Sequence, residues 1–262
     1  MTVLDEIVSN TRSELEERMK KVPLEVLRAR ISEQKQYRKA RPFRSRFSDP
    51  GSSVLIAEIK PRSPSAGKLI DSPLKVAELY AESAADAISV LTDNKYFGGS
   101  LELLQHVREK VPQAILRKDF IVDEYQVYET LAGGGDAFLL IAAVLEKDKL
   151  AELISLGESL GIGSLVEVHD EEDVKKAIEA NAKLIGINNR NLRTMEIDLS
   201  TTETLMNSIP KDIPVVSESG IYTADDVLRV RKTGVRGILV GTAILESNDP
   251  LEKIRELQKA MI

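Results

Sequence analysis

The chain has 262 residues, of which 42% are hydrophobic and 30% are charged. This length suits one large domain, and this composition is typical of a globular protein. With 36 basic and 42 acidic side chains the net charge is −6, which argues against a nucleic-acid partner. Cysteine is absent and histidine occurs twice, at His106 and His169. Disulfides and thiol nucleophiles are therefore excluded, and we expect no metal site.

The amino terminus carries no apolar segment typical of a signal peptide, and no run approaches 18 apolar residues. We therefore expect a cytoplasmic protein with no membrane segment.

Residues 1–46 are predicted to form a helical extension. Val3, Ile7 and Leu15 recur at helical spacing, and Pro23 begins a second helical segment with Leu27 on its apolar face. Eight Lys or Arg and a single acid lie between residues 28 and 46. A solvated helix and linker is the favoured interpretation of this charge, followed by a positive rim that attracts an anionic small molecule. Nucleic-acid binding ranks last because aromatic residues are sparse there.

Residues 54–262 alternate short β-branched runs with helical patterns, several of which begin at Ser, Thr or Asp and end at Gly. Eight such repeats predict an α/β protein with eight βα units closed into a (β/α)8 TIM barrel, and a single domain over 1–262. A doubly wound open sheet is the alternative, but no G-x-G-x-x-G follows the first strand. The predicted strands are 54–60, 87–93, 114–120, 137–144, 164–169, 184–190, 214–220 and 237–242.

Polar residues follow almost every predicted strand at its carboxyl end, where barrels of this kind place their chemistry. Several of them are two positions apart, so the members of a pair face the same way. As structure alone, such a set of charges at one cavity mouth would be costly. The residues are Glu58, Lys60, Lys118, Glu167, Asn188, Arg190 and Glu218.

Each member of this set also has a purely structural interpretation, because ion pairs and turns occur without function. An active site is favoured because all of these residues are expected at the same rim of the barrel. His169 is interpreted as a strand-end residue and not as a catalyst. The structural interpretations are a Glu58–Lys60 ion pair, a solvated Lys118–Asp119 pair, and a turn at Asn188 and Asn189.

The last two strands end in "SESGI" and "LVGTAIL", each with a small residue and a glycine just before a helix. The loops after strands 7 and 8 commonly bind phosphate through backbone N–H groups. We therefore expect Ser219, Gly220, Gly241 and Thr242 to cradle a phosphate.

The chain resembles the indole-3-glycerol-phosphate synthase family of tryptophan biosynthesis. The segments that carry the resemblance span most of the chain: "IAEIKPRSPSAG", "KYFGGS", "LRKDFIVDEYQVYE", "LVEVHDEEDV", "IGINNRNLRT", "VSESGI" and "LVGTAIL". The resemblance implies a cofactor-free ring closure, in which 1-(2-carboxyphenylamino)-1-deoxyribulose 5-phosphate loses CO2 and water to give indole-3-glycerol phosphate. It also implies a monomer whose partner is this small phosphorylated substrate.

The same resemblance implies roles for individual residues. Lys118 matches the general acid that protonates the substrate carbonyl. Lys60 matches a lysine that contacts the anionic substrate or serves as a second acid. Glu167 matches the carboxylate that removes a proton in the dehydration, assisted by Glu58. The substrate-positioning matches are Asn188, Arg190, Glu218 and Ser219; the phosphate-cradle matches are Ser219, Gly220, Gly241 and Thr242; the apolar-wall matches are Pro64, Phe97, Phe120, Leu139, Leu192 and Val240.

Ordinary core packing is the alternative for the six wall residues. The loop "SPSAG" is expected to cover the site, with Ser63 within reach of the substrate. We expect Lys60, Lys118 and Arg190 to lower one another's pKa, so that a lysine can act as an acid near neutral pH. Which lysine protonates at which step stays open. The rival functions are another phosphate-binding barrel enzyme, such as a sugar-phosphate isomerase or a Schiff-base aldolase, and an idle binding protein.

Overall fold

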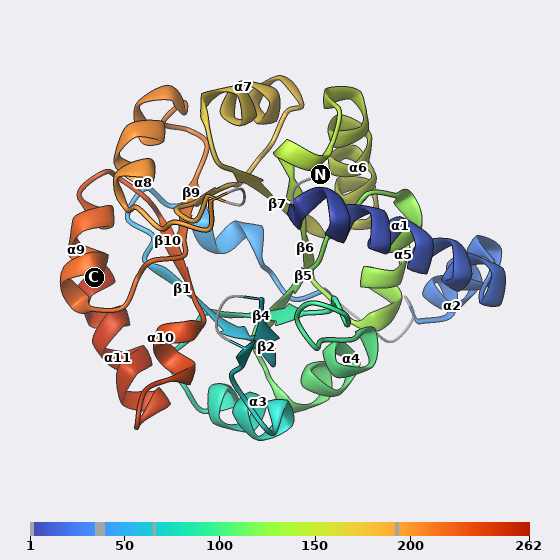
Figure 1. The fold of residues 1–262 in the computed structure, drawn as a ribbon, viewed down its shortest axis with the longest axis horizontal. Helices are drawn as coiled ribbons and strands as arrows, with labels where there is room; N and C mark the ends of the chain where they lie inside the picture. Colours follow the sequence, from blue (N-terminus) through green and yellow to red (C-terminus); the bar gives the residue numbers. More distant parts are fainter. Residues whose placement is uncertain (1–2, 35–39, 65–66, 192–193) are drawn as a thin grey trace.

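The computed structural model describes residues 3–34, 40–64, 67–191 and 194–262. Eight parallel strands close into a barrel, in which each strand pairs with its neighbour in the chain and the last pairs with the first (Figure 1). The predicted (β/α)8 barrel is confirmed, and the open-sheet alternative is wrong. The barrel strands are β1 (Val54–Ile59), β4 (Ala87–Leu91), β5 (Ala114–Lys118), β6 (Ala137–Ile141), β7 (Gly163–Val168), β8 (Ile185–Asn188), β9 (Val215–Glu218) and β10 (Gly237–Val240).

Helices surround the barrel (Figure 1). Side chains predicted as caps hold several of their first turns: Ser100 accepts a hydrogen bond from Leu103 N, and Thr223 forms a capping box with Asp226. Gly134 ends one helix at φ 100°, in the left-handed region that favours glycine. The helices are α3 (Pro73–Ala81), α4 (Leu101–Lys110), α5 (Glu124–Gly133), α6 (Lys147–Leu160), α7 (Glu171–Glu179), α8 (Ser200–Leu205), α9 (Ala224–Arg231), α10 (Thr242–Leu245) and α11 (Pro250–Met261), with 3₁₀ turns η1 (Arg44–Phe47), η2 (Ala142–Val144) and η3 (Met206–Ser208).

The apolar core has two layers, because successive strand side chains face opposite ways. On β7, Val166 and Val168 pack outward against helices, whereas Leu165 points into the barrel. The barrel interior also takes Phe47 from η1, which packs beside Gly237 at the start of β10. The amino-terminal end of the barrel is therefore filled with apolar side chains, and the polar strand ends lie at the opposite end.

The amino-terminal extension forms two helices, α1 (Val3–Lys21) and α2 (Leu24–Gln34), as predicted. In Figure 1, α1 lies across the β5–β6 side of the barrel, and α2 packs against α5. Part of the basic stretch is bound rather than solvated: Arg41 donates from Nη1 to the carbonyls of Val111 and Gln113. Within the described residues, no helix is both long and apolar enough to cross a bilayer.

Candidate active site

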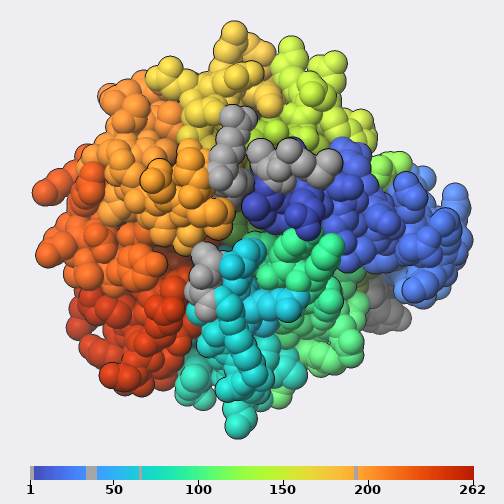
Figure 2. All heavy atoms as spheres, viewed as in Figure 1, coloured from blue at the N-terminus to red at the C-terminus, as the bar shows by residue number. Residues whose placement is uncertain are grey.

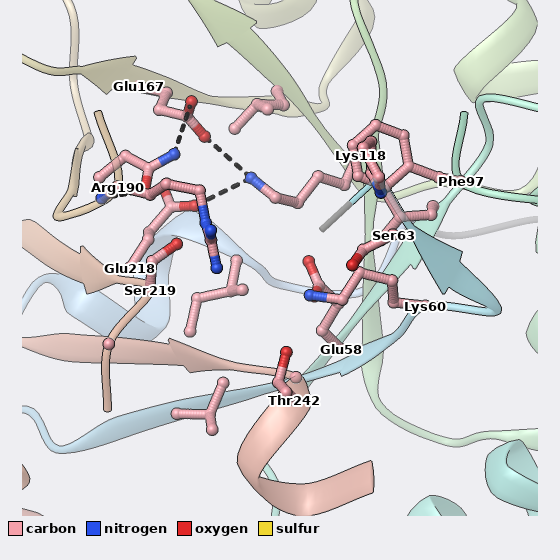
Figure 3. A pocket seen from close by; sticks show the side chains of 18 of the residues that line it. Glu58, Lys60, Ser63, Phe97, Lys118, Glu167, Arg190, Glu218, Ser219 and Thr242 are labelled. Atoms are coloured by element: carbon pink, nitrogen blue, oxygen red, sulfur yellow. Dashed lines mark hydrogen bonds and ion pairs between the residues drawn. The ribbon is translucent and has the colours of Figure 1, made fainter. Parts of the chain in front are cut away.

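A pocket opens at the carboxyl ends of the barrel strands, and it gathers the predicted site residues (Figure 3). Figure 2 shows this face in space-filling form, with the first turns of α1 in dark blue beside the central hollow. Leu192, a predicted wall residue, lies outside the described residues. The predicted residues that line the pocket are Glu58, Lys60, Ser63, Pro64, Phe97, Lys118, Phe120, Leu139, Glu167, Asn188, Arg190, Glu218, Ser219, Gly220, Val240, Gly241 and Thr242.

Lys118, the last residue of β5, lies between two carboxylates from other strands. Its Nζ is 2.9 Å from Glu167 Oε2 and 2.9 Å from Glu218 Oε2 (Figure 3). The other oxygen of Glu167 accepts a hydrogen bond of 3.1 Å from Asn188 Nδ2. The alternative of a solvated Lys118–Asp119 pair is wrong, because Lys118 points into the pocket and pairs with Glu167 and Glu218.

Glu58 and Lys60 form the ion pair that their spacing predicts, with 2.8 Å between Lys60 Nζ and Glu58 Oε2. Both side chains also line the pocket, so the ion pair and a place in the site are compatible. Gly241 lies against this pair, since a Cβ at that position would collide with Glu58 Oε2. The glycine thus leaves the space that the Glu58 carboxylate occupies.

The carboxylates control the charge state of the site. Burial alone would lower the pKa of Lys118, but Glu167, Glu218 and Glu58 raise it above its ordinary value. The expectation that neighbouring cations lower this lysine's pKa is therefore wrong. Burial raises the pKa of Glu167, but Lys118 and His169 outweigh it and hold that pKa below its usual range. Burial, with repulsion from Glu167, raises the pKa of Glu218 to about 7.

β5 is anchored by Arg117, whose side chain is 1% exposed and does not line the pocket. Its guanidinium lies 2.8 Å from Asp119 Oδ2 and 3.3 Å from Glu129 Oε2, and it donates to the carbonyl of Gln126 at 2.8 Å. Arg18 of α1 contacts the other oxygen of Glu129 at 2.9 Å. This buried network joins the extension to the strand that carries Lys118.

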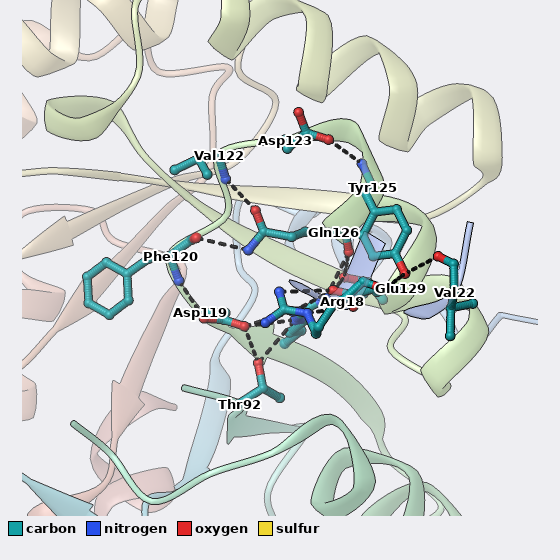
Figure 4. Close-up of polar contacts among 12 residues, drawn as sticks. Arg18, Val22, Thr92, Asp119, Phe120, Val122, Asp123, Tyr125, Gln126 and Glu129 are labelled. Atoms are coloured by element: carbon teal, nitrogen blue, oxygen red, sulfur yellow. Dashed lines mark hydrogen bonds and ion pairs between the residues drawn. The ribbon is translucent and has the colours of Figure 1, made fainter. Parts of the chain in front are cut away.

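The aromatic wall is held by a side chain of α5 and a side chain of the loop after β4. Gln126 accepts from Val122 N at 2.8 Å and donates to the Phe120 carbonyl at 3.0 Å (Figure 4). Asp93 accepts from the backbone N–H of Phe97 at 3.0 Å. The rings of Phe97 and Phe120 come within 6.1 Å of each other, centroid to centroid. The five predicted wall residues in described positions all line the pocket, and two of them, Leu139 and Val240, also belong to the buried core.

The loop after β9 has an unusual backbone. Ser219 has φ 63° and Gly220 has φ 79°, and the former is rare for a residue with a side chain. Asn189 holds this loop by donating from Nδ2 to the carbonyls of Glu218 and Ser219, each at 3.0 Å. The interpretation of Asn189 as a turn residue alone is therefore wrong, since its side chain braces the predicted phosphate cradle.

Sequence reasoning missed parts of the site. Val3, Leu4 and Ile7 of α1 line the pocket, although their helical spacing indicated only an apolar face. His169 contacts Glu167, with 3.2 Å between Nε2 and Oε1. The spacing of two residues between Glu167 and His169 was the available signal. The loop after β1 also contains two short antiparallel strands that were not predicted, β2 (Arg62–Ser63) and β3 (Gly67–Lys68). Residues 65 and 66 of the predicted covering loop "SPSAG" lie outside the described residues.

Known proteins resemble this chain in sequence and in fold. The family model described as indole-3-glycerol phosphate synthase matches residues 4–257. The indole-3-glycerol phosphate synthase of Acetivibrio thermocellus is 41% identical over 258 residues, 98% of this chain and 99% of that protein. That of a Nocardioides species is 45% identical over 259 residues, 98% of each. Among solved structures, 3-hexulose-6-phosphate synthase from Salmonella typhimurium shares the fold, with a TM-score of 0.65 and 16% identity over 79% of this chain and 98% of that one. The chain belongs to the indole-3-glycerol phosphate synthase family.

Proposed function

We propose that this protein is a carboxy-lyase of tryptophan biosynthesis, converting 1-(2-carboxyphenylamino)-1-deoxyribulose 5-phosphate into indole-3-glycerol phosphate, CO2 and water. The observation that carries the proposal is the placement of Lys118 Nζ, 2.9 Å from both Glu167 and Glu218 at the base of an aromatic-walled pocket. Such a reaction needs an acid and a base that act on one bound molecule. Relatives named for this activity, at 41–45% identity, support it.

Lys118 acts as the general acid. Its raised pKa keeps the ammonium protonated until substrate arrives. The proton then passes from Nζ to the carbonyl oxygen of the substrate while a ring carbon attacks the carbonyl carbon. Protonation of Glu218, whose pKa is about 7, removes one of the anions that hold the Lys118 proton. Glu218 thereby makes Lys118 a stronger acid near neutral pH.

Glu167 acts as the base of the dehydration. In the resting site its pKa is held low, because Lys118 and His169 outweigh the effect of burial. Once Lys118 has given up its proton it no longer stabilises the carboxylate, so the basicity of Glu167 rises. Glu167 then takes the proton whose removal completes the indole double bond, while a second acid, for which Lys60 is the candidate in the pocket, protonates the hydroxyl so that it leaves as water. Because Lys118 and Glu167 are in contact, the loss of the Lys118 proton precedes the uptake of a proton by Glu167.

The remaining lining residues bind and orient the substrate. Phe97 and Phe120 hold the carboxyphenyl ring, and an apolar surrounding favours loss of CO2 from a carboxylate that is poorly solvated there. Leu192 remains a predicted wall residue. Ser219 and Gly241, with the residues that follow them, take the phosphate through backbone N–H groups. We further propose that the enzyme is a cytoplasmic monomer that uses no metal or other cofactor.

The activity is tested by mixing the purified chain with the substrate and following indole absorbance or fluorescence. We expect a signal that persists in EDTA. A folded protein that gives no indole signal contradicts the proposal. The Schiff-base aldolase alternative is tested by borohydride reduction in the presence of substrate. We expect no adduct, and an adduct on Lys118 would favour the aldolase.

Gly241→Ala should lower kcat by about tenfold or more, because the new Cβ displaces the Glu58 carboxylate that pairs with Lys60. Steady-state kinetics measure the effect. Gly51→Ala is the matched control, since nothing lies within 4 Å of a Cβ at that position. Equal kinetics for the two variants would mean that the position of Glu58 does not matter.

A further inference from the structure

His169 and Asp173 form a buried pair directly behind Glu167. His169 Nε2 lies 3.2 Å from Glu167 Oε1, and Nδ1 lies 3.5 Å from Asp173 Oδ2. These are ion-pair contacts rather than aligned hydrogen bonds. The imidazole is 13% exposed, and it does not line the pocket. The Asp173 carboxylate, the His169 imidazole and the Glu167 carboxylate thus form a chain of contacts that leads from α7 to the predicted base.

Local structure fixes this arrangement. His169 follows β7 directly, and Asp173 lies in the first turn of α7, which Asp170 caps by accepting from Asp173 N at 2.9 Å. Asp173 Oδ2 accepts from the backbone N–H of His169 at 3.1 Å, so the same carboxylate orients the main chain and the ring. Lys176 lies 4.0 Å from the other oxygen of Asp173 and donates to the Ala142 carbonyl. The pair therefore has little freedom to turn away.

We propose that His169, held by Asp173, is a positioning residue that keeps Glu167 ionised and aimed at the substrate after Lys118 has given up its proton. The inference rests on the proposed function, because it assigns His169 a role toward the base of that reaction. In the resting site Glu167 has three polar partners: Lys118 on one oxygen, Asn188 and His169 on the other. When Lys118 becomes neutral, His169 is the remaining cation in contact with Glu167 among the residues that the structure describes.

The charge of the imidazole supports this role. The charged groups that face it or its partners are Glu167 on β7, Asp173 and Lys176 on α7, and Lys118 on β5. Burial lowers the pKa of His169, but Asp173 and Glu167 outweigh it and raise the pKa to about 9. The ring is therefore cationic throughout the neutral range, and its charge stabilises the ionised form of Glu167.

Kinetics give the first test. His169→Ala should lower kcat about 10- to 100-fold and change KM by less than about threefold, because orientation of the base is lost while substrate contacts remain. His169→Gln should recover part of kcat, since its amide can donate to Glu167. Asp173→Asn should also lower kcat. His106→Ala is the matched control, because His106 is exposed on α4. A His169→Ala variant as active as this control overturns the proposal.

The second test is spectroscopic and needs no turnover. With two histidines in the chain, the His106→Ala variant leaves a single imidazole to follow by NMR. We expect it to titrate at about 9, and Glu167→Gln to move the titration down toward the ordinary value of about 6.5. An unchanged titration overturns the proposal, since His169 would then act by packing. Failure of the proposed function appears differently, as absence of indole from the unmodified protein.

Discussion

Lys118→Met should lower kcat/KM about 10³-fold, because the substitution removes the proposed acid from the reacting carbonyl. KM should change less, since the apolar walls and the phosphate loops are left in place. The loss of the ammonium also leaves Glu167 and Glu218 facing each other without a cation. The pKa of both carboxyls should therefore rise, because Lys118 lowers each of them in the intact site. Steady-state kinetics with the purified variants measure the effect.

Lys183→Met is the matched control, because Lys183 is exposed and lies outside the pocket. A Lys118→Met variant that keeps a tenth of the activity would exclude Lys118 as the acid. The Lys60→Met variant distinguishes the role of Lys60 from that of Lys118. A rise in KM alone would make Lys60 a substrate contact, whereas a fall in kcat at saturating substrate would make it a second acid.

Arg117→Met should destabilise the protein by about 3–5 kcal/mol, because breaking a buried ion pair leaves uncompensated charges behind. Arg117 is 1% exposed and its partners Asp119 and Glu129 are 8% and 6% exposed. Water therefore cannot replace the lost contacts. Urea unfolding followed by circular dichroism measures the change in the free energy of unfolding.

The control for this prediction is an ion pair of similar chemistry at the surface. Arg229 contacts Glu203 at 2.7 Å, and both side chains are at least 40% exposed. Arg229→Met should have a much smaller effect, since solvent screens exposed pairs. If the two variants unfold at the same urea concentration, the Arg117 network does not anchor the extension and β5 in the way described.

The periodicity of the sequence predicted the barrel well, because parallel strands and their helices have distinct and regular patterns. It also placed the polar strand ends, since alternation along a strand fixes the side of the barrel that a residue faces. Glu58, Lys118, Glu167 and Glu218 were brought to one pocket by that argument, and the structure confirms their meeting. Closing eight parallel strands into a barrel places their carboxyl ends around one mouth, and this brings the four side chains together.

Contacts between elements were not predictable in the same way. Nothing in the local pattern says that Arg117 pairs with Glu129, or that α1 brings Ile7 to the pocket. The direction of the Lys118 pKa shift was mistaken for the same reason. The sequence indicated both cations and carboxylates at one rim. Whether the pKa of Lys118 rises or falls depends on which of these groups lie closest to its ammonium, and those are Glu167 and Glu218. His169 was interpreted as a strand-end residue, and the local pattern gave no sign of its contact with Asp173 on α7.

We propose that this site couples decarboxylation to indole formation. The most direct measurement uses substrate labelled with carbon-13 in the carboxyl group, with CO2 and the indole product quantified together in a single turnover. We predict that labelled CO2 and indole-3-glycerol phosphate appear in equal amounts, and that neither appears with Lys118→Met. Release of CO2 without the indole product, or no release by the folded protein, would contradict the account.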